Sequence, residues 1–241
     1  MDYKLIDTHC HLLFGVDDGP QKIEESVQML VKAAGEGIGD IILTPHYRHG
    51  MFPYIKEDIL RNFRALQESA AKEEINLYLG CEYHVDSRCT ERFKSGRCLT
   101  LAGSSYILTE YSHITEYSYI LTMTQNLLLT GYTPVIAHTE RYPCMLKSVA
   151  HAKELRRMGA MIQINADSVL GLEGRNQKLY CKNLLKEGAA DIIASDSHGI
   201  EDRVCHLREC RDLVEKKYGN EAALLLFKEN PEKILKDASM A

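Results

Sequence analysis

Short runs of β-branched and other apolar residues alternate with amphipathic stretches from one end of the chain to the other. In the stretches at residues 23–34, 55–74 and 149–158, apolar residues recur at the i, i+3, i+4 spacing of a helix. Such alternation is typical of βα units that build a parallel sheet. The expected strands lie at residues 4–7, 40–44, 76–80, 106–109, 134–137, 161–164 and 191–194. Seven strands predict an α/β fold in which a parallel sheet curls into a distorted (β/α)7 barrel similar to a TIM barrel.

The length of the chain fits one domain. Its 241 residues, 45% of them hydrophobic, are enough to bury a full core, and no linker or low-complexity segment divides them. We therefore expect a single domain over residues 1–241. Residues 80–103 are the least regular segment and are expected to form a long connection or hairpin over the mouth of the barrel.

Charge, hydropathy and cysteine usage narrow the class of protein. The formal net charge is -5, and no cluster of Lys and Arg provides the basic face that nucleic-acid binding needs. No apolar run reaches transmembrane length, and residues 1–20 carry Asp and His where a signal peptide would be apolar. The eight cysteines include no Cys-x-x-Cys pair, as expected of reduced thiols in a cytosol. We expect a cytoplasmic protein that neither enters a membrane nor binds nucleic acid.

His9 and His11 stand two residues apart at the end of the first expected strand. Because side chains alternate along a strand, both imidazoles point to the same side and can share a metal ion. A His-x-His pair alone is weak evidence. Further His, Asp and Glu residues, however, follow the ends of other expected strands. They are His46, Glu82, Glu110, His138, Asp196 and His198, together with Asp18 in the turn after the first strand.

The carboxyl ends of strands in a parallel barrel converge on one face, where such folds place their active sites. Any one of the nine residues is more simply explained as a cap, a salt bridge or a core histidine, but all nine together are not. Five imidazoles and four carboxylates exceed the needs of one ion, so we expect a cluster of two or three metal ions. Mixed nitrogen and oxygen donors favour Mn, Fe or Zn over Ca.

Other residues near the expected ligands have weaker signals. Arg48, Arg141 and Arg203 each follow a ligand and are expected to bind an anionic substrate such as a phosphate, although each is as easily an exposed surface residue. Three aromatic side chains are candidates to pack against a phenolic ring, with core packing an equal alternative for the last: Tyr47, Phe52 and Tyr142. The remaining histidines are expected to be solvated or structural: His49, His84, His113, His151 and His206.

Seven blocks of sequence carry these residues: 7–11 (DTHCH), 16–20 (VDDGP), 44–46 (TPH), 50–52 (GMF), 80–82 (GCE), 134–142 (PVIAHTERY) and 194–198 (ASDSH). These blocks resemble those of the PHP (polymerase and histidinol phosphatase) superfamily, and the resemblance extends over nearly the whole chain. Within it, they resemble the bacterial protein-tyrosine phosphatases of capsular and exopolysaccharide synthesis. The resemblance implies a PHP-type barrel of seven strands with three metal ions. It would place His9, His11, Glu82 and Asp196 around one ion, Glu82, Glu110 and His138 around a second, and Asp18, His46 and His198 around a third.

On this resemblance we expect a metal-dependent protein-tyrosine phosphatase, a phosphoric monoester hydrolase in which a metal-activated hydroxide attacks phosphorus. Manganese is the metal expected first, with iron, zinc, magnesium and cobalt as alternatives. Arg141, Arg203 and Asp196 are expected to act in catalysis, and Arg48 to bind substrate beside the other two arginines. The implied partner is a phosphotyrosine protein, namely a bacterial tyrosine kinase with a tyrosine-rich tail. The sequence leaves the oligomeric state open.

Three alternatives accompany this hypothesis. A histidinol-phosphate phosphatase, or another small-molecule phosphatase of the same superfamily, would use the same ligands. A non-catalytic metal-binding regulatory module is disfavoured because all nine ligand positions are filled. A cysteine nucleophile in a Cys-x5-Arg loop is formally matched by Cys205 and Arg211. However, the residues between them contain no Gly and predict a helix rather than a phosphate-binding loop.

Overall fold

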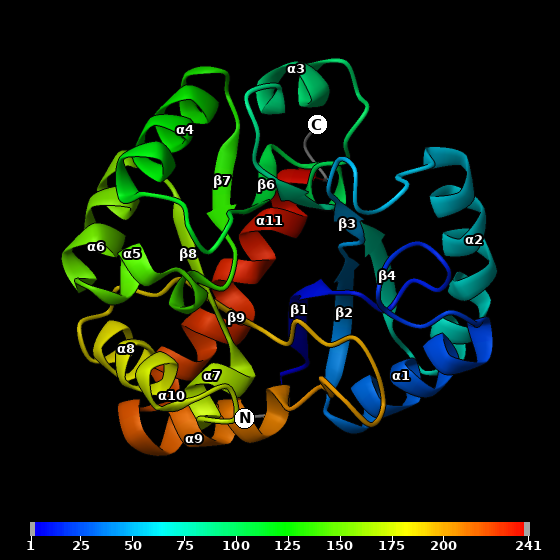
Figure 1. The fold of residues 1–241 in the computed structure, drawn as a ribbon. Coiled ribbons are helices and arrows are strands. Elements are labelled where there is room, and N and C mark those ends of the chain that lie inside the picture. Colours follow the sequence, from blue (N-terminus) through cyan, green and yellow to red (C-terminus); the bar gives the residue numbers. More distant parts are fainter. Residues whose placement is uncertain (1–2, 239–241) are drawn as a thin grey trace.

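The computed structural model, in which residues 3–238 are described, confirms the predicted α/β architecture (Figure 1). Its parallel strands occupy the centre and most of its helices surround them. The expectation of one domain over residues 1–241 stays a prediction, and its outermost residues, 1–2 and 239–241, lie outside the described residues.

The centre of the fold is a set of parallel strands that covers all seven predicted positions. In chain order the strands are β1 (Leu5–Cys10), β2 (Ile38–Leu43), β3 (His46–Tyr47), β4 (Asn76–Leu79), β5 (Glu82–His84), β6 (Tyr106–Glu110), β7 (Thr133–Ile136), β8 (Met161–Asn165) and β9 (Ile192–Ala194). Two predicted strands are each followed by a second short piece, so that β3 continues β2 and β5 continues β4. The break before β3 holds Pro45, which has no backbone N–H to donate to a ladder. Backbone bonds bridge the breaks, from Gly80 N to Leu43 O (2.8 Å) and from Glu82 N to Pro45 O (3.1 Å).

The strand β5 corrects one prediction. Residues 80–103 were expected to form an irregular connection, but their start belongs to the barrel wall and only the remainder forms a loop with α3 (Cys89–Lys94). The three residues of β5, Glu-Tyr-His, form no apolar run, unlike the equally short β9 (Ile-Ile-Ala), which is why the pattern missed it.

The sheet curls until its first and last strands meet. Hydrogen bonds join β1, β2 and β4 into one section of the sheet and β3, β5, β6, β7, β8 and β9 into another. Beyond the end of β9, Ser197 pairs with Cys10 of β1 in a parallel bridge. Asp196 N donates to His9 O (2.8 Å) and His11 N donates to Ser197 O (2.9 Å). The barrel is thus closed by a few bonds at the carboxyl ends of β1 and β9.

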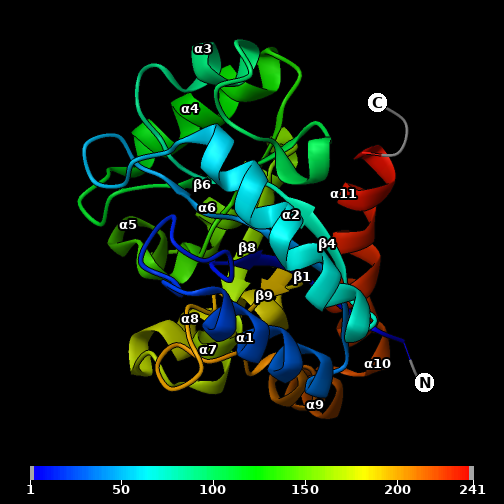
Figure 2. The same ribbon diagram turned by 90° about the vertical axis from the view of Figure 1, so that its right-hand side faces the viewer.

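The helices pack around the strands in chain order (Figures 1 and 2). They are α1 (Ile23–Gly35), α2 (Lys56–Lys72), α3, α4 (Tyr117–Leu129), α5 (Pro143–Leu146), α6 (Val149–Met158), α7 (Ala166–Leu170), α8 (Arg175–Lys186), α9 (Leu207–Tyr218), α10 (Asn220–Leu224) and α11 (Asn230–Ala238). The three stretches with helical spacing are confirmed as α1, α2 and α6. Gly159 ends α6 in the left-handed conformation (φ 115°), which glycine adopts without steric cost. Among the described residues, every helix is too short or too polar to span a bilayer.

Apolar side chains fill the barrel beneath the predicted ligands. Leu108 on β6 and Ala194 of β9 belong to a buried cluster that also contains Ile234 of α11. By the period of 2, Leu108 and Ala194 face the same side as Glu110 and Asp196, two residues further along. Figure 2 shows α11 against the end of the barrel away from the loops that follow the strands. The polar site therefore rests on a closed apolar floor.

Candidate metal centre

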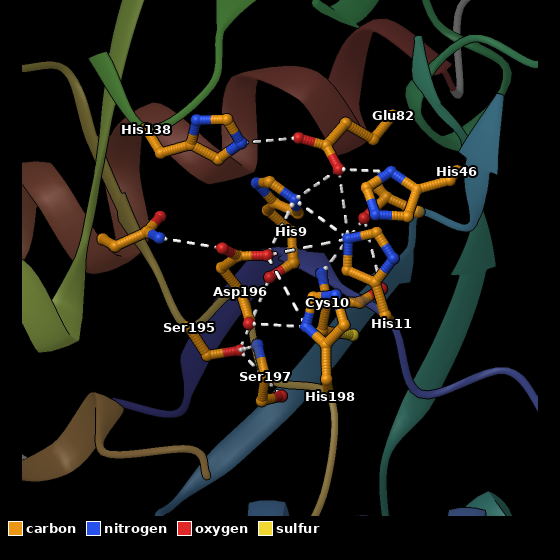
Figure 3. A network of polar contacts seen from close by, with 12 residues as sticks. His9, Cys10, His11, His46, Glu82, His138, Ser195, Asp196, Ser197 and His198 are labelled. Atoms are coloured by element: carbon orange, nitrogen blue, oxygen red, sulfur yellow. Dashed lines mark hydrogen bonds and ion pairs between the residues drawn. The ribbon is translucent and has the colours of Figure 1, made fainter. Parts of the chain in front are cut away.

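All nine predicted ligands converge at the carboxyl ends of the strands, and seven of them are labelled in Figure 3. Their ligand atoms form four groups in which all atoms lie within 4.8 Å of one another. The groups are His11, Asp18, His46 and His198; His9, His11 and Asp196; His9, Glu82 and His138; and His46, Glu82 and Glu110. The sequence thus identified a set of side chains that the fold assembles from the ends of six of the seven predicted strands, all but β8.

Glu82 lies at the middle of the cluster. Its Oε1 is 2.7 Å from Nε2 of His138, and its Oε2 is 3.4 Å from His9 Nε2, 3.2 Å from His11 Nε2 and 3.0 Å from His46 Nδ1. The parallel register of β3 and β5, which pairs His46 with Glu82, sets this position. One buried carboxylate facing four imidazoles has the geometry of a ligand that bridges metal ions.

A second part of the cluster gathers around Asp18. Its Oδ1 lies 3.4 Å from Nε2 of His46 and 3.5 Å from Nε2 of His198, and the ring of His198 stacks on that of His11 with centroids 3.9 Å apart. Asp18, His46 and His198 are the three residues that the resemblance assigned to one ion. Glu110 differs from that assignment, because its carboxylate groups with His46 and Glu82 rather than with His138.

The nitrogen atoms of the cluster fit bound metal ions. Among the described residues, no contact of the buried His46 Nδ1 or His198 Nε2 has the geometry of a hydrogen bond, although carboxylate oxygens of Glu82 and Asp18 lie 3.0 and 3.5 Å from them. Nε2 of His9 and Nε2 of His11 face each other at 3.2 Å. Buried polar atoms without a partner are costly, and bound metal ions would satisfy these atoms.

The pKa shifts at the site reflect an excess of carboxylate charge that favours bound cations. Burial lowers the pKa of His9, but the charges of Glu82 and Asp196 outweigh burial and raise this pKa to about 9. The pKa of His46 is likewise raised to about 11, against burial, by Glu82 and Asp18. Burial and the charge of His11 lower the pKa of His198 to about 4. Against burial, the neighbouring histidines and arginines lower the pKa values of Glu82, Asp196 and Asp18, and metal cations would likewise favour these ionised carboxylates.

Two of the three predicted arginines lie against the cluster. Nη1 of Arg141 is 2.7 Å from Oδ2 of Asp196, and Nη2 of Arg203 is 3.1 Å from the same oxygen. Arg141 also forms an ion pair with Glu173. The guanidinium of Arg48, by contrast, makes no ion pair with the nine ligands in the part of the chain described. The roles of all three arginines stay predictions.

The backbone at the site is strained. Five non-glycine residues between 3 and 238 have positive φ, and three of them are candidate site residues: His138 (φ 30°), Asp196 (φ 51°) and Arg203 (φ 49°). Side chains of L-amino acids make this conformation unfavourable, so the surrounding bonds must hold it. The strain lies at the residues whose side chains must point into the cluster.

Residues that the sequence analysis did not identify hold the ligands in place. Oδ2 of Asp17 lies 2.8 Å from Nδ1 of His11 and accepts a bond from His46 N (3.1 Å). Oε1 of Gln163 lies 3.3 Å from Nδ1 of His9, and Asn165 donates to Asp196 Oδ2 (2.9 Å). Gln163 and Asn165 alternate on β8, which supplies no predicted ligand. Polar side chains at alternate positions of a buried strand were the signal that could have found them.

The other histidines and aromatic residues divide between core and site. His84 was expected to be solvated or structural, but its Nδ1 lies 3.0 Å from Oε2 of Glu110, opposite which β5 and β6 place it. Phe52 stacks on His46 with ring centroids 5.0 Å apart. Tyr142 is fully buried, and its hydroxyl accepts a bond from Tyr111 N and lies 3.3 Å from Nδ1 of the candidate ligand His138, so it packs in the core beneath the site. Tyr47 packs against Tyr54 and Tyr83.

The cysteines do not support a cysteine nucleophile. All eight are free and buried. Burial raises the pKa of Cys205 well above that of an ordinary thiol, and α9 begins two residues later. The helix leaves no loop that could cradle phosphate, and a reactive cysteine would need a lowered pKa.

Comparison with known proteins identifies relatives that match almost the whole chain. The chain is 35% identical over 240 residues to the tyrosine-protein phosphatase CpsB of Streptococcus pneumoniae, covering 97% of this chain and 99% of that protein. It is 30% identical to the tyrosine-protein phosphatase YwqE of Bacillus subtilis, covering 98% and 93%.

Solved structures agree. The chain matches one from the crystal structures of YwqE and CpsB, described as unique metal-dependent tyrosine phosphatases, with a TM-score of 0.90, 29% identity and coverage of 97% and 95%. The phosphotriesterase homology protein of Escherichia coli, at a TM-score of 0.64 and 12% identity, covering 97% of this chain and 99% of that one, shares the fold alone. The family model described as capsular polysaccharide synthesis, CpsB/CapC, matches residues 5–236, and the chain therefore belongs to the CpsB/CapC family.

Proposed function

We propose that this chain is a metal-dependent tyrosine-protein phosphatase that hydrolyses phosphotyrosine in a protein substrate. The observation that carries the proposal is the convergence of nine metal-ligating side chains around Glu82, with Arg141 and Arg203 directed at the same carboxylate, Asp196. The tyrosine phosphatases that match nearly the whole chain support it.

The donor set supports two or three metal ions, with manganese first and iron, zinc, magnesium or cobalt as alternatives. His9, His11 and Asp196 would hold one ion, and Asp18, His46 and His198 would hold another, with His11 near both. Glu82, His138 and Glu110 would complete the centre. When bound, the ions would lower the pKa of a coordinated water and neutralise charge on the phosphoryl oxygens.

The protein groups around the centre position the phosphoryl group. Arg141 and Arg203 would bind its non-reacting oxygens, and Asp196 holds both guanidinium groups beside the metal ligands. Attack of a water oxygen on phosphorus, opposite the tyrosine oxygen, would form one P–O bond as the P–O bond to tyrosine breaks, and the released phenolate would take up the proton that the water gives up. Phe52, stacked on His46, offers an apolar surface for the phenolic ring, and Arg48 is a third candidate for substrate contact.

The rim of the site favours a protein over a small-molecule substrate. Met51, Ile114, Leu172 and Ile200 are exposed. They lie in segments that follow β3, β6, β8 and β9, at the same end of the barrel as the ligands. We propose that these side chains contact the polypeptide on either side of the phosphotyrosine. The substrate that we propose is the tyrosine-rich tail of a bacterial tyrosine kinase of capsular polysaccharide synthesis, encountered in the cytoplasm.

The test combines metal analysis with turnover. Elemental analysis of the purified protein, with hydrolysis of a phosphotyrosine peptide and of histidinol phosphate before and after chelation, is expected to give two or three metal ions and chelator-sensitive peptide turnover. Preference for histidinol phosphate would make the chain a small-molecule phosphatase. Metal without turnover of either would indicate a regulatory module, and neither metal nor turnover would overturn the proposal.

A further inference from the structure

A cavity of about 540 Å³ opens beside the metal centre. It lies between the turn at residues 18–21, the first turns of α1 and the loop at residues 199–203. Two candidate metal ligands, Asp18 and His198, line it together with Arg203. The cavity is therefore continuous with the place where the phosphate of a substrate would bind, and it is large enough for one long side chain.

The wall of this cavity is acidic. Glu25, Glu201 and Asp202 line it in addition to the ligand Asp18. The basic side chain of Arg203 also lines the cavity, and its guanidinium lies against Asp196 and Asp18. Within residues 3–238, neither the Glu201 nor the Asp202 carboxylate has an ion pair with a basic side chain. Glu25 uses its Oε2 to accept bonds from the backbone at Gln21 and Lys22.

The same cavity has an apolar part. Met29, one turn after Glu25 on the same face of α1, lines it with Pro20 and Ile200. Met29 and Pro20 are buried, whereas Ile200 is exposed. An apolar surface that ends in carboxylates matches a lysine or arginine side chain, which packs its aliphatic part on apolar atoms and keeps its charged end among polar groups.

We infer that this cavity is a subsite for a basic side chain that flanks the phosphotyrosine of the substrate. The inference rests on the proposed function, because the phosphotyrosine fixes the peptide at the metal centre. A negative phosphate is drawn to the metals and arginines, while the adjoining acidic wall attracts a cation on the same peptide. Complementary charges of this kind determine which sequence is preferred more than how tightly peptides in general bind.

The experiment compares phosphotyrosine peptides that are identical except for one residue. Lysine is moved through the three positions on each side of the phosphotyrosine in an otherwise alanine background, and kcat/KM is measured with the metal-loaded enzyme. At one or more positions lysine is expected to raise kcat/KM about fivefold over alanine, the effect of a partly exposed ion pair. Norleucine, which keeps the apolar stem without the charge, is expected to give a smaller gain, and glutamate a loss.

A double variant separates this subsite from long-range attraction. Glu201→Gln with Asp202→Asn is expected to abolish the preference for lysine and to leave kcat/KM for the all-alanine peptide and for p-nitrophenyl phosphate within twofold. The matched control, Glu57→Gln with Glu68→Gln, removes two exposed charges from α2 and should keep the preference. No lysine preference at any position, or a preference that survives in the double variant, would overturn the inference. Failure of the wild-type enzyme to hydrolyse the all-alanine peptide would instead count against the proposed function.

Discussion

Oδ2 of Asp17 lies 2.8 Å from Nδ1 of His11, inside a site where both side chains are almost completely buried. The same oxygen accepts the backbone N–H of His46 at 3.1 Å. The bond to Nδ1 leaves Nε2 of His11 as the nitrogen that faces Glu82 and Asp196. Asp17 thus orients one candidate ligand and the backbone of another without being a predicted ligand itself.

Replacing Asp17 by Asn tests this role. The amide keeps the shape but loses the negative charge, so we expect metal affinity to fall about 10- to 100-fold, as for other partners of metal-bound histidines. Competition with a metal chelator measures the affinity, and excess metal should restore most of the turnover. Asp212→Asn, an exposed carboxylate on α9, is the control and should bind metal as the wild type does. Unchanged affinity in the Asp17 variant would remove Asp17 from the metal centre.

Arg141→Lys tests whether a planar guanidinium is needed. Arg141 contacts Asp196 and Glu173 with different nitrogens, which one ammonium group cannot reproduce. We expect kcat/KM for a phosphotyrosine peptide to fall about a hundredfold, as when a preorganised contact to transition-state charge is lost. Metal content should not change, and Arg64→Lys, on the exposed face of α2, should retain full activity. Activity within twofold of wild type would exclude Arg141 from catalysis.

The strand and helix positions were predictable because the spacing of apolar residues within each short segment indicates which structure that segment forms. The pattern found α6 at residues 149–158 and seven of the nine strands between residues 3 and 238, namely β1, β2, β4, β6, β7, β8 and β9. It could not find β3 and β5, which have only two and three residues and exist because Thr44-Pro45 and Gly80-Cys81 interrupt longer strands. Closure of the barrel through Cys10 and Ser197 could not be predicted either, since it depends on bonds between residues nearly two hundred positions apart.

The convergence of the candidate metal ligands was predictable for a different reason. They follow strand ends, and a parallel barrel brings strand ends together whatever the details of its loops. The residues that support them are harder to find in the sequence, because Asp17 and Gln163 act through hydrogen bonds set by tertiary structure. The same limit explains His84, whose contact with Glu110 depends on the register of β5 and β6.

Cys205→Ala tests the cysteine nucleophile. The thiol is buried, its pKa is raised well above the ordinary value by that burial, and the helix α9 follows it. We therefore expect the variant to keep kcat/KM for a phosphotyrosine peptide within twofold, and iodoacetamide to leave the metal-loaded wild-type enzyme active. Loss of activity in the alanine variant, with its thermal unfolding and metal content unchanged, would revive the thiol mechanism.

Gly19→Ala tests how tightly the turn at residues 16–20 must pack against the first ligand pair. A Cβ at Gly19 would lie 2.1 Å from the carbonyl oxygen of His11 and 3.1 Å from Oδ1 of Asp17, so the backbone or the His11–Asp17 bond must shift. We expect the free energy of unfolding to fall by about 1–3 kcal/mol, the usual cost of overpacking, and metal affinity to fall with it.

Gly35→Ala is the matched control, because its Cβ would meet nothing within 4 Å at the end of α1. The control should stabilise the protein by up to about 1 kcal/mol, since alanine restricts the unfolded chain more than glycine does. Urea unfolding and chelator competition measure both variants. Equal stability of the two would mean that the turn moves freely and does not hold His11 in place.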